Sequence, residues 1–383
     1  MQLVPEIVAF AAELVAVRRD IHAHPEIGFT ETRTAAIVAT ALNDWGVEVH
    51  AGIGGTGVVG VIRGNRPGRR IGLRADMDAL PMQETTGLAY ASTHPGAFHG
   101  CGHDGHTAML LAAARYLSAS RRFAGEVVLI FQPAEEGLGG AVAMLRDGLF
   151  ERFPCDEIYG LHNWPNAPLG QITLKHGAAM AASDNFDIVV RGKGAHGAEP
   201  QNSADPIMAA TAIAQGLQTI VSRNVGPLRS ATVSVTQFHA GSAYNVIPES
   251  AHLAGTIRTF DPVVRELIAE RMRQIASSVA EGYGTTAEVT VRNLFQVLYN
   301  SEAQSEAAMD VARLLVGPEL AKFETQPVGG SEDFADMLQY VPGAYLFLGQ
   351  GPGPSLHNPR YDFNDDALPI GASLYARIAE ARG

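Results

Sequence analysis

Apolar and polar residues alternate with two different periods up to about residue 180. Near the N-terminus, apolar positions recur three to four residues apart, which predicts amphipathic helices. Farther along, continuous apolar runs such as EVVLIFQP are typical of strands that are buried on both faces. Strands that alternate with helices indicate an α/β domain with a largely parallel or mixed sheet. The predicted helices cover 5–20, 30–45 and 107–117, and the predicted strands cover 57–64, 69–78, 126–133, 157–163 and 170–177.

The pattern changes near residue 184. From there the chain has the order strand, helix, strand, strand, helix, strand, with the helices predicted at 205–222 and 262–283. This β-α-β-β-α-β order is that of a ferredoxin-like unit. We therefore predict a larger α/β domain in two segments, 1–182 and 294–383, interrupted by an inserted domain at 183–293. In the last segment we predict helices at 301–315, 331–340 and 367–381 and a strand at 344–351.

Length and composition agree with two domains. The chain has 383 residues, and single cores stop growing at ~250–300 residues. A net charge of -12 argues against nucleic acid or an anionic membrane as a partner, because both require a positive surface. No run approaches the ~20 apolar residues of a membrane span, and no secretory signal is evident. The only cysteines are Cys101 and Cys155, so we expect a cytoplasmic protein without a disulfide framework.

The segment FHGCGHDGHT (98–107) contains the strongest candidate chemistry. Cys101 and His103 are two residues apart among glycines that allow the backbone to approach an ion. Thiolate and imidazole are ligands that zinc-class ions prefer. The alternative is a glycine-rich turn whose polar residues only cap the following helix. Three histidines beside a cysteine favour a metal site.

Further polar groups follow other predicted strands. FQPAEEG presents Glu135 and Glu136, of which one can ligate a metal and the other can act as a general base. His162 ends the strand in GLHNWP, and His357 lies in a polar loop after a strand. Each of these residues alone is more typical of a structural or solvated group. Because ligand sites form where strand ends meet at one edge of an α/β sheet, we expect these side chains to converge.

Two aspartates and two histidines allow a structural interpretation. Asp76 and Asp78 end another strand and, at a spacing of two, face the same side. Both can orient ligand imidazoles, but an ion pair with Arg74 explains Asp76 equally well. His22 and His24 lie at a helix end, where histidine binds the last carbonyl groups, and we interpret them as structural.

Seven segments in sequence order resemble one family of enzymes. The segments are RRDIHAHPEIGF, GLRADMDALPMQE, HGCGHDGHTA, FQPAEEGLGGA, GLHNWP, GSEDFA and LHNPRYDFND. They resemble the co-catalytic metallo-amidohydrolases that include aminoacylase and carboxypeptidase G, in particular the branch of hippurate hydrolases and N-acyl-amino-acid amidohydrolases. The resemblance covers nearly the whole chain. It implies a zinc-exopeptidase-like α/β catalytic domain with an inserted ferredoxin-like lid through which the protein forms a homodimer.

The resemblance also implies a set of site residues and a reaction. The implied metal ligands are Cys101, His103, Glu136, His162 and His357. They would hold two divalent ions, zinc, manganese, cobalt or nickel. We expect the Cys101 thiolate to bridge the ions, with His103 and His162 on one and Glu136 and His357 on the other. Glu135 would serve as general base and acid in hydrolysing the amide bond of an N-acyl amino acid, supported by Asp78.

Three residues of the inserted domain complete this prediction. His196, in GAHGAEPQN, is implied to stabilise the oxyanion, often in the partner subunit's cleft. Asn245 and Arg258 match positions that bind the substrate carboxylate. Glu199 and Gln201 stand where relatives often carry Met and His, and Gly329 also departs from the family pattern. The rival interpretations are a dinuclear aminopeptidase and a non-catalytic metal-binding protein.

Overall fold

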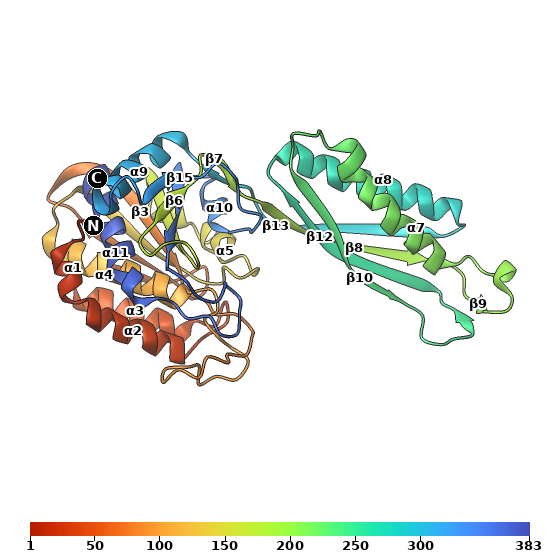
Figure 1. The fold of residues 1–383 in the computed structure, drawn as a ribbon, viewed down its shortest axis with the longest axis horizontal. Coiled ribbons are helices and arrows are strands. Elements are labelled where there is room, and N and C mark those ends of the chain that lie inside the picture. The colour runs from red at the N-terminus through yellow and green to blue at the C-terminus, as the bar shows by residue number, and fades with distance from the viewer. The chain divides into compact units, whose positions relative to one another are not determined.

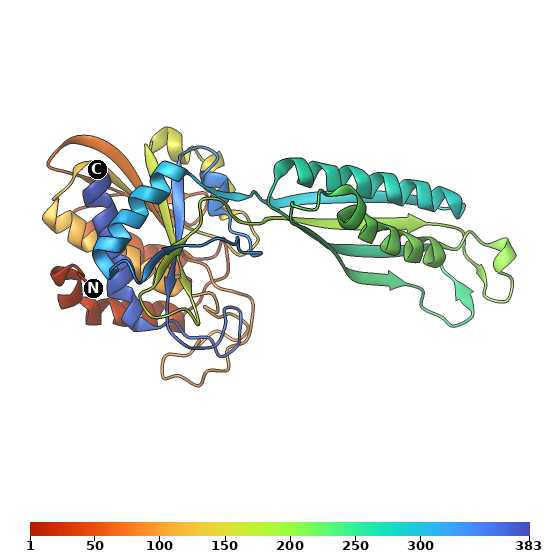
Figure 2. The ribbon, with the colours of Figure 1, turned by 45° about the horizontal axis from the view of Figure 1, so that its top comes forward.

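The computed structural model describes residues 1–383 and divides them into two compact units. Unit 1 comprises Met1–Ala179, Tyr299–Gln326 and Asp333–Gly383, and unit 2 comprises Met180–Leu298 and Pro327–Glu332. Figures 1 and 2 show the fold of each unit from two sides. Unit 2 contains the whole of the predicted inserted segment and also a short stretch near residue 330.

Unit 1 is built on a mixed eight-stranded sheet in the order β1-β2-β4-β3-β5-β16-β6-β15. The four central strands, β4, β3, β5 and β16, run parallel to one another. Each of these strands has a buried stretch, which is a continuous apolar run in β4, as parallel strands covered on both faces require. The strands are β1 (Glu48–Ile53), β2 (Gly57–Arg63), β3 (Arg66–Asp76), β4 (Ala124–Gln132), β5 (Glu157–Trp164), β6 (Ile172–Leu174), β15 (Ala321–Phe323) and β16 (Gly343–Gly349). A separate pair consists of β7 (Gly177–Met180) and β14 (Leu298–Asn300).

The helix α4 lies at the centre of the unit 1 core. It is buried along nearly its whole length and packs against α2 and α11, since its small side chains allow close approach. The predicted helix at 331–340 is wrong in length, because regular α-helix there is limited to α10. The helices are α1 (Pro5–Ala9), α2 (Ala11–Ala23), α3 (Thr32–Asp44), α4 (His103–Ser120), α5 (Gly140–Arg146), α6 (Leu149–Arg152), α9 (Glu302–Val316), α10 (Phe334–Met337), η3 (Asp365–Ala367) and α11 (Leu368–Arg382).

The parallel strands deliver several loops to one edge of the sheet. Asp76, the last residue of β3, pairs in register with Gln132, the last residue of β4. His162, near the end of β5, pairs with Phe347 near the end of β16. The turns that follow these strands therefore emerge side by side, which is where open α/β sheets bind ligands.

Unit 2 has the predicted ferredoxin-like order. Its sheet is antiparallel in the order β10-β12-β8-β13, and α7 and α8 cover one face of it (Figure 1). Each helix starts with an aspartate that accepts hydrogen bonds from the first turn and a proline at the first helical position: Asp205 before α7 and Asp261 before α8. The elements are β8 (Ala182–Arg191), β9 (Ala195–His196), η1 (Pro200–Asn202), α7 (Pro206–Thr219), η2 (Ile220–Asn224), β10 (Ala231–Ala240), β11 (Val246–Ile247), β12 (Ser250–Thr259), α8 (Pro262–Gly282) and β13 (Thr286–Phe295).

The fold prediction, a mixed α/β domain with an inserted ferredoxin-like domain, is confirmed. No helix in the structure combines the length and the apolar character that crossing a membrane requires.

Candidate metal centre

The five predicted metal ligands lie together at the carboxyl edge of the unit 1 sheet. Ligand atoms of Cys101, His103 and His162 lie within 4.8 Å of one another, and so do those of Cys101, Glu136 and His357. The two groups share only the Cys101 thiol. This arrangement places two further donors on either side of one sulfur atom.

Individual distances between ligand atoms also show that the five side chains lie close together. Cys101 Sγ lies 3.5 Å from His162 Nε2, and Glu136 Oε1 lies 3.4 Å from His357 Nε2 and 4.0 Å from His103 Nε2. His103 Nε2 and Glu136 Oε1 are both buried without a hydrogen-bond partner. Buried polar atoms are nearly always paired, so two such atoms pointing at a shared space fit ligands of a cation.

Neighbouring groups orient the ligand rings. His103 Nδ1 lies 3.2 Å from Asp78 Oδ1, and His162 Nδ1 lies 2.7 Å from the carbonyl oxygen of Asn163. Each partner can accept a hydrogen bond from Nδ1–H, which leaves the Nε2 lone pair directed at the centre, as in metal-binding histidines generally. The backbone N–H of Glu136 donates to the other Asp78 oxygen at 3.0 Å. Asp78 therefore fixes one ligand ring and one ligand-bearing turn.

Glu135 lies beside the ligand cluster. One of its carboxylate oxygens is within 4.8 Å of ligand atoms of both His103 and Glu136, and its side chain is 7% exposed. It follows Ala134, whose φ of 53° is in the left-handed region. This sharp turn directs two consecutive carboxylates to the same edge of the sheet.

Asp76 belongs to a buried polar network below the cluster. Its carboxylate lies 2.7 Å from Arg74 Nη1 and 2.6 Å from His106 Nδ1. The structure thus contains the ion pair with Arg74 that we considered as the alternative role for Asp76. Arg74 also donates to Asp333 at 3.2 Å, and Asp333 accepts from the backbone N–H of Ala141 at 2.9 Å.

The sequence prediction assigned no role to His106 or Asp333. A signal existed for Asp333, because GSEDFA is one of the resembling segments. Its partners could not be identified from the sequence, since Arg74 and Asp333 are 259 positions apart.

In the absence of a metal, the surroundings raise the pKa values of three of the predicted ligands, so these groups tend to be protonated. Burial raises the pKa of the Cys101 thiol, and the Glu136 carboxylate raises it further. Burial opposes the charged form of His103, but Asp76 and Cys101 outweigh it and raise the pKa of this ring well above its usual value. The neighbouring Cys101 and Glu136 side chains raise the pKa of His357 to about 10. A metal must displace these protons, so binding is coupled to pH.

His22 and His24 lie outside the ligand cluster. His24 Nδ1 lies 2.8 Å from the carbonyl oxygen of Asp20, the helix-end contact that we predicted. His22 is buried, with its Nδ1 2.8 Å from Asp104 Oδ2. Burial lowers the pKa of His22, but the hydrogen bond and charge of Asp104 outweigh this effect and raise it to about 9. Since Asp104 directly follows His103, His22 anchors the start of α4.

The three predicted site residues of unit 2 occupy two separate places. His196 and Asn245 lie together at one tip: His196 pairs with Val246, and the N–H of Gly197 donates to the Asn245 carbonyl oxygen at 2.8 Å. Both side chains are exposed. Arg258 lies near the opposite end of β12, half-buried, with its guanidinium donating to Thr256 and to the Ile257 carbonyl oxygen.

The length of β12 separates these two places. Ser250 begins the strand beside the tip, and Arg258 is eight residues farther along. At ~3.4 Å per residue the two ends are ~27 Å apart. One chain therefore does not bring Asn245 and Arg258 to the same small substrate.

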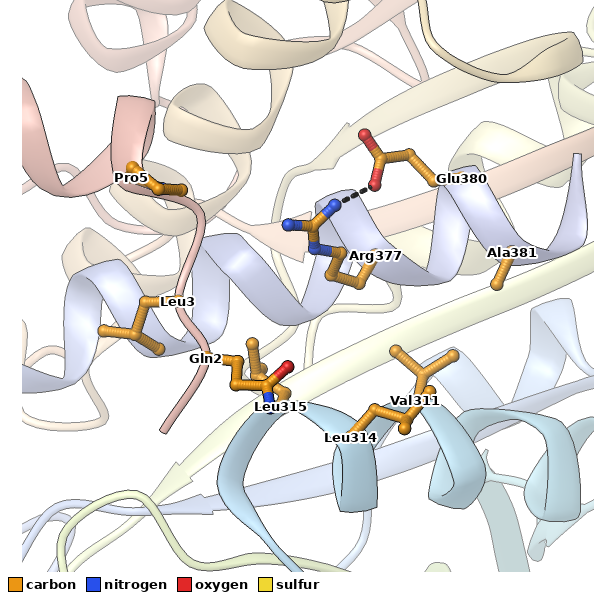
Figure 3. Close-up of a pocket in the computed structure, with 9 residues that line it drawn as sticks. All are labelled: Gln2, Leu3, Pro5, Val311, Leu314, Leu315, Arg377, Glu380 and Ala381. Carbon is orange, nitrogen blue, oxygen red and sulfur yellow. Dashed lines mark hydrogen bonds and ion pairs between the residues drawn. The ribbon is translucent and has the colours of Figure 1, made fainter.

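A cavity elsewhere in unit 1 contains none of the predicted residues. It has a volume of 520 Å³ and lies between the N-terminal segment, α9 and α11 (Figure 3). Apolar side chains such as Leu3 and Leu315 line it, and its Arg377 forms an ion pair with Glu380. It lacks the convergent donors and bases of the ligand cluster, so we place the candidate active site at the cluster.

Comparisons with known proteins cover nearly the whole chain. The sequence profile of Peptidase family M20/M25/M40 matches residues 72–381, which include all five candidate ligands. A hippurate hydrolase from Campylobacter jejuni is 44% identical over 379 residues, covering 99% of each chain. An N-acetylcysteine deacetylase from Bacillus subtilis is 39% identical over 373 residues, covering 97% of each.

A solved structure extends the likeness to three dimensions. It is a Bacillus subtilis protein described as a dinuclear metal binding peptidase from the M20 family. It superposes with a TM-score of 0.85 at 36% identity and covers 97% of each chain. Its description as dinuclear agrees with the presence of two ligand groups in this chain.

Proposed function

This chain belongs to peptidase family M20/M25/M40, as its motifs indicated, and we propose that it hydrolyses the amide bond of N-acyl amino acids to a carboxylic acid and a free amino acid. One observation carries the proposal: a buried carboxylate, Glu135, lies beside the five predicted ligands and is additional to them. Metal retention alone does not require such a group. Hippurate and N-acetylcysteine, named in the descriptions of two relatives, are both N-acyl amino acids.

We propose that His103 and His162 would hold one divalent ion and that Glu136 and His357 would hold the other, with Cys101 belonging to both ligand groups. The two ligand groups and the two unpaired buried atoms support this division. A mixed sulfur, nitrogen and oxygen donor set suits zinc, manganese, cobalt or nickel. Bound ions would lower the pKa of a water molecule and polarise the amide carbonyl.

The residues of the chain then divide the proton transfers. Glu135 removes a proton from the attacking water and later delivers it to the amide nitrogen, which leaves only once protonated. Asp78 acts through its neighbours, because it holds the His103 ring and the backbone of Glu136. It is a positioning residue in this mechanism.

We also propose a homodimer joined through the inserted domain. If His196, Asn245 and Arg258 all serve one substrate, two chains must supply them, because β12 keeps the tip and Arg258 apart within a chain. In this arrangement His196 of the partner subunit stabilises the oxyanion, and the amide and guanidinium groups bind the substrate carboxylate. We propose a cytoplasmic location, since a composition with two cysteines, one of them a candidate metal ligand, suits a reducing compartment.

A substrate panel tests the proposal. The protein, loaded with each divalent metal in turn, is assayed on N-acetyl amino acids, N-benzoyl amino acids and free dipeptides, with Glu135→Gln as the control for contaminating activity. We expect turnover of the acylated substrates. Cleavage of dipeptides alone would identify an aminopeptidase, and two bound ions without any turnover would identify a non-catalytic metal protein.

A further inference from the structure

The segment Glu26–Glu31 packs against the two turns that carry Asp78 and Glu135. The N–H of Ala79, next to Asp78, donates to the Glu26 carbonyl oxygen at 2.8 Å. On the other side, a Cβ atom added to Gly28 would lie 2.9 Å from the Cα of Ala134. The backbone of this segment is therefore in close contact with the turn that precedes Glu135.

Ala134 holds this turn in an unfavourable conformation. Its φ is 53°, and a residue with a Cβ atom adopts the left-handed region only at an energetic cost. Such a conformation persists only where the surroundings determine it. The contacts that do so are hydrogen bonds at both of its backbone polar groups: its N–H donates to Glu31 Oε1 at 2.8 Å, and its carbonyl oxygen accepts from Gly140 N at 3.0 Å.

Glu31 is itself fully buried and fixed. Its second oxygen accepts a hydrogen bond from Thr56 Oγ1 at 2.5 Å. A buried carboxylate is costly unless its oxygens are satisfied, and here one of the two satisfies the backbone of the turn. A helix-cap role does not account for the side chain, since no hydrogen bond joins it to the first turn of α3.

We propose that Glu31 is a positioning residue for the reaction: by binding the Ala134 N–H it holds the left-handed turn that directs Glu135 and Glu136 to the ligand cluster. The inference rests on the proposed function in assigning Glu135 as the base. Glu31 belongs to neither the predicted ligand set nor the predicted catalytic set, and it contacts the reacting groups only through the turn.

The consequence of losing this contact is specific. Without an acceptor, the buried Ala134 N–H is left unpaired, which favours relaxation of the turn toward φ < 0. Such a relaxation would move the carboxylates of Glu135 and Glu136. Loss of a group that supports a metal site typically costs ~10–100-fold in activity or metal affinity. We expect kcat to fall by this factor for Glu31→Leu with little change in KM, because the residues proposed to bind the substrate carboxylate lie in unit 2.

Conservative and matched variants separate positioning from stability. Glu31→Gln keeps an oxygen acceptor for Ala134 and an amide group that can donate to Thr56, so kcat should stay near that of the wild type. Thr56→Val removes the other hydrogen bond of Glu31 and leaves the Ala134 contact intact, so it should lower kcat much less than Glu31→Leu. The double variant Glu31→Leu/Ala134→Gly should recover part of the lost kcat, since glycine adopts φ > 0 without steric cost.

Three readouts are measured on each variant: kcat and KM on an N-acyl amino acid, Zn²⁺ affinity from titration of metal-free protein, and Tm. Unchanged kcat and Zn²⁺ affinity in Glu31→Leu would overturn the proposal. The proposal would also be overturned if Glu31→Gln and Glu31→Leu/Ala134→Gly showed the same losses of kcat and Zn²⁺ affinity as Glu31→Leu, with Tm falling in parallel. That result would indicate a general structural role for Glu31. If Glu31→Leu does not fold, Glu31→Ala replaces it.

The Zn²⁺ titration also separates this proposal from the proposed function. If the wild type hydrolyses no N-acyl amino acid, but Glu31→Leu weakens Zn²⁺ binding and Glu31→Gln restores it, the proposed function fails and the positioning role stands.

Discussion

The metal-ligand cluster of unit 1 and the tip of unit 2 are constructed in different ways. In the cluster, His103 is fully buried, Cys101 and Glu135 are each 7% exposed, and neighbouring groups orient the ligand rings. At the tip, His196 and Asn245 are exposed, and the backbone makes most of the contacts there. The adjacent Tyr244 is also fully exposed.

This difference shows which part of the active site a single unit completes. Cys101, His103 and His162 are buried, and only His357 among the ligands is exposed, so each chain holds its own preorganised ligand cluster. Exposed polar groups at a tip have nothing to act on within their own unit. The comparison therefore predicts that changes in the cluster abolish the chemistry within each chain, whereas changes at the tip can be complemented by another chain.

Removing the metal should have the largest effect. Dialysis against a chelator should abolish hydrolysis, and added Mn²⁺, Co²⁺ or Zn²⁺ should restore it. Because Cys101, His103 and His357 hold protons tightly without metal, reloading should weaken as the pH falls. Metal content and activity are measured together across pH. Full activity in a sample shown to be metal-free would refute the role of the cluster.

Glu135→Gln should lower kcat by ~10²–10⁴, the usual cost of losing a general base. The fold and both ions should remain, because the two ligand groups do not include Glu135. Glu136→Gln is the matched control, one residue along the same turn, and should lower the metal content itself. If elemental analysis finds an ion lost from the first variant and none from the second, the two roles are reversed.

His196→Ala should lower kcat by ~10²–10³ at unchanged metal content, the range for one oxyanion donor. Mixing this variant with Glu135→Gln under subunit exchange should restore part of the activity, because one mixed dimer then contains an intact site. His239→Ala, another exposed histidine of unit 2, serves as the control. A loss of kcat that mixing does not restore would place His196 in its own chain's site.

The smallest effect concerns stability. His22 has a pKa of about 9 in the folded protein and 6.5 as its ordinary value. Its interaction with Asp104 therefore contributes fully below pH 6.5 and is lost as the pH rises through about 9. His22→Gln should lower Tm at pH 6 and flatten the decline of Tm between pH 6.5 and 9. His24→Gln, on the exposed end of the same helix, should leave the profile unchanged.

Local patterns were sufficient to predict most of the elements. The apolar run EVVLIFQP is the strand β4, and the Asp-Pro pairs at 205 and 261 start α7 and α8. The strand β1 was not predicted, because its half-exposed residues give no continuous apolar run. The helix predicted at 331–340 is shorter in the structure, where only α10 (Phe334–Met337) is regular helix, and Asp333 just before it binds Arg74, Gln132 and Ala141.

The sequence by itself determined the ligand types and the edge of the sheet where they gather. Glutamate and histidine side chains at the ends of the parallel strands β4 and β5 emerge on the same side of the sheet, because register and strand direction place them there. Only the tertiary structure decided how these groups are held. The partners of the site residues come from positions remote in the chain, such as Glu31 for Ala134, and chain folding brings them together through burial that no local pattern encodes. For the same reason, only the structure separated Arg258 from the tip that carries His196.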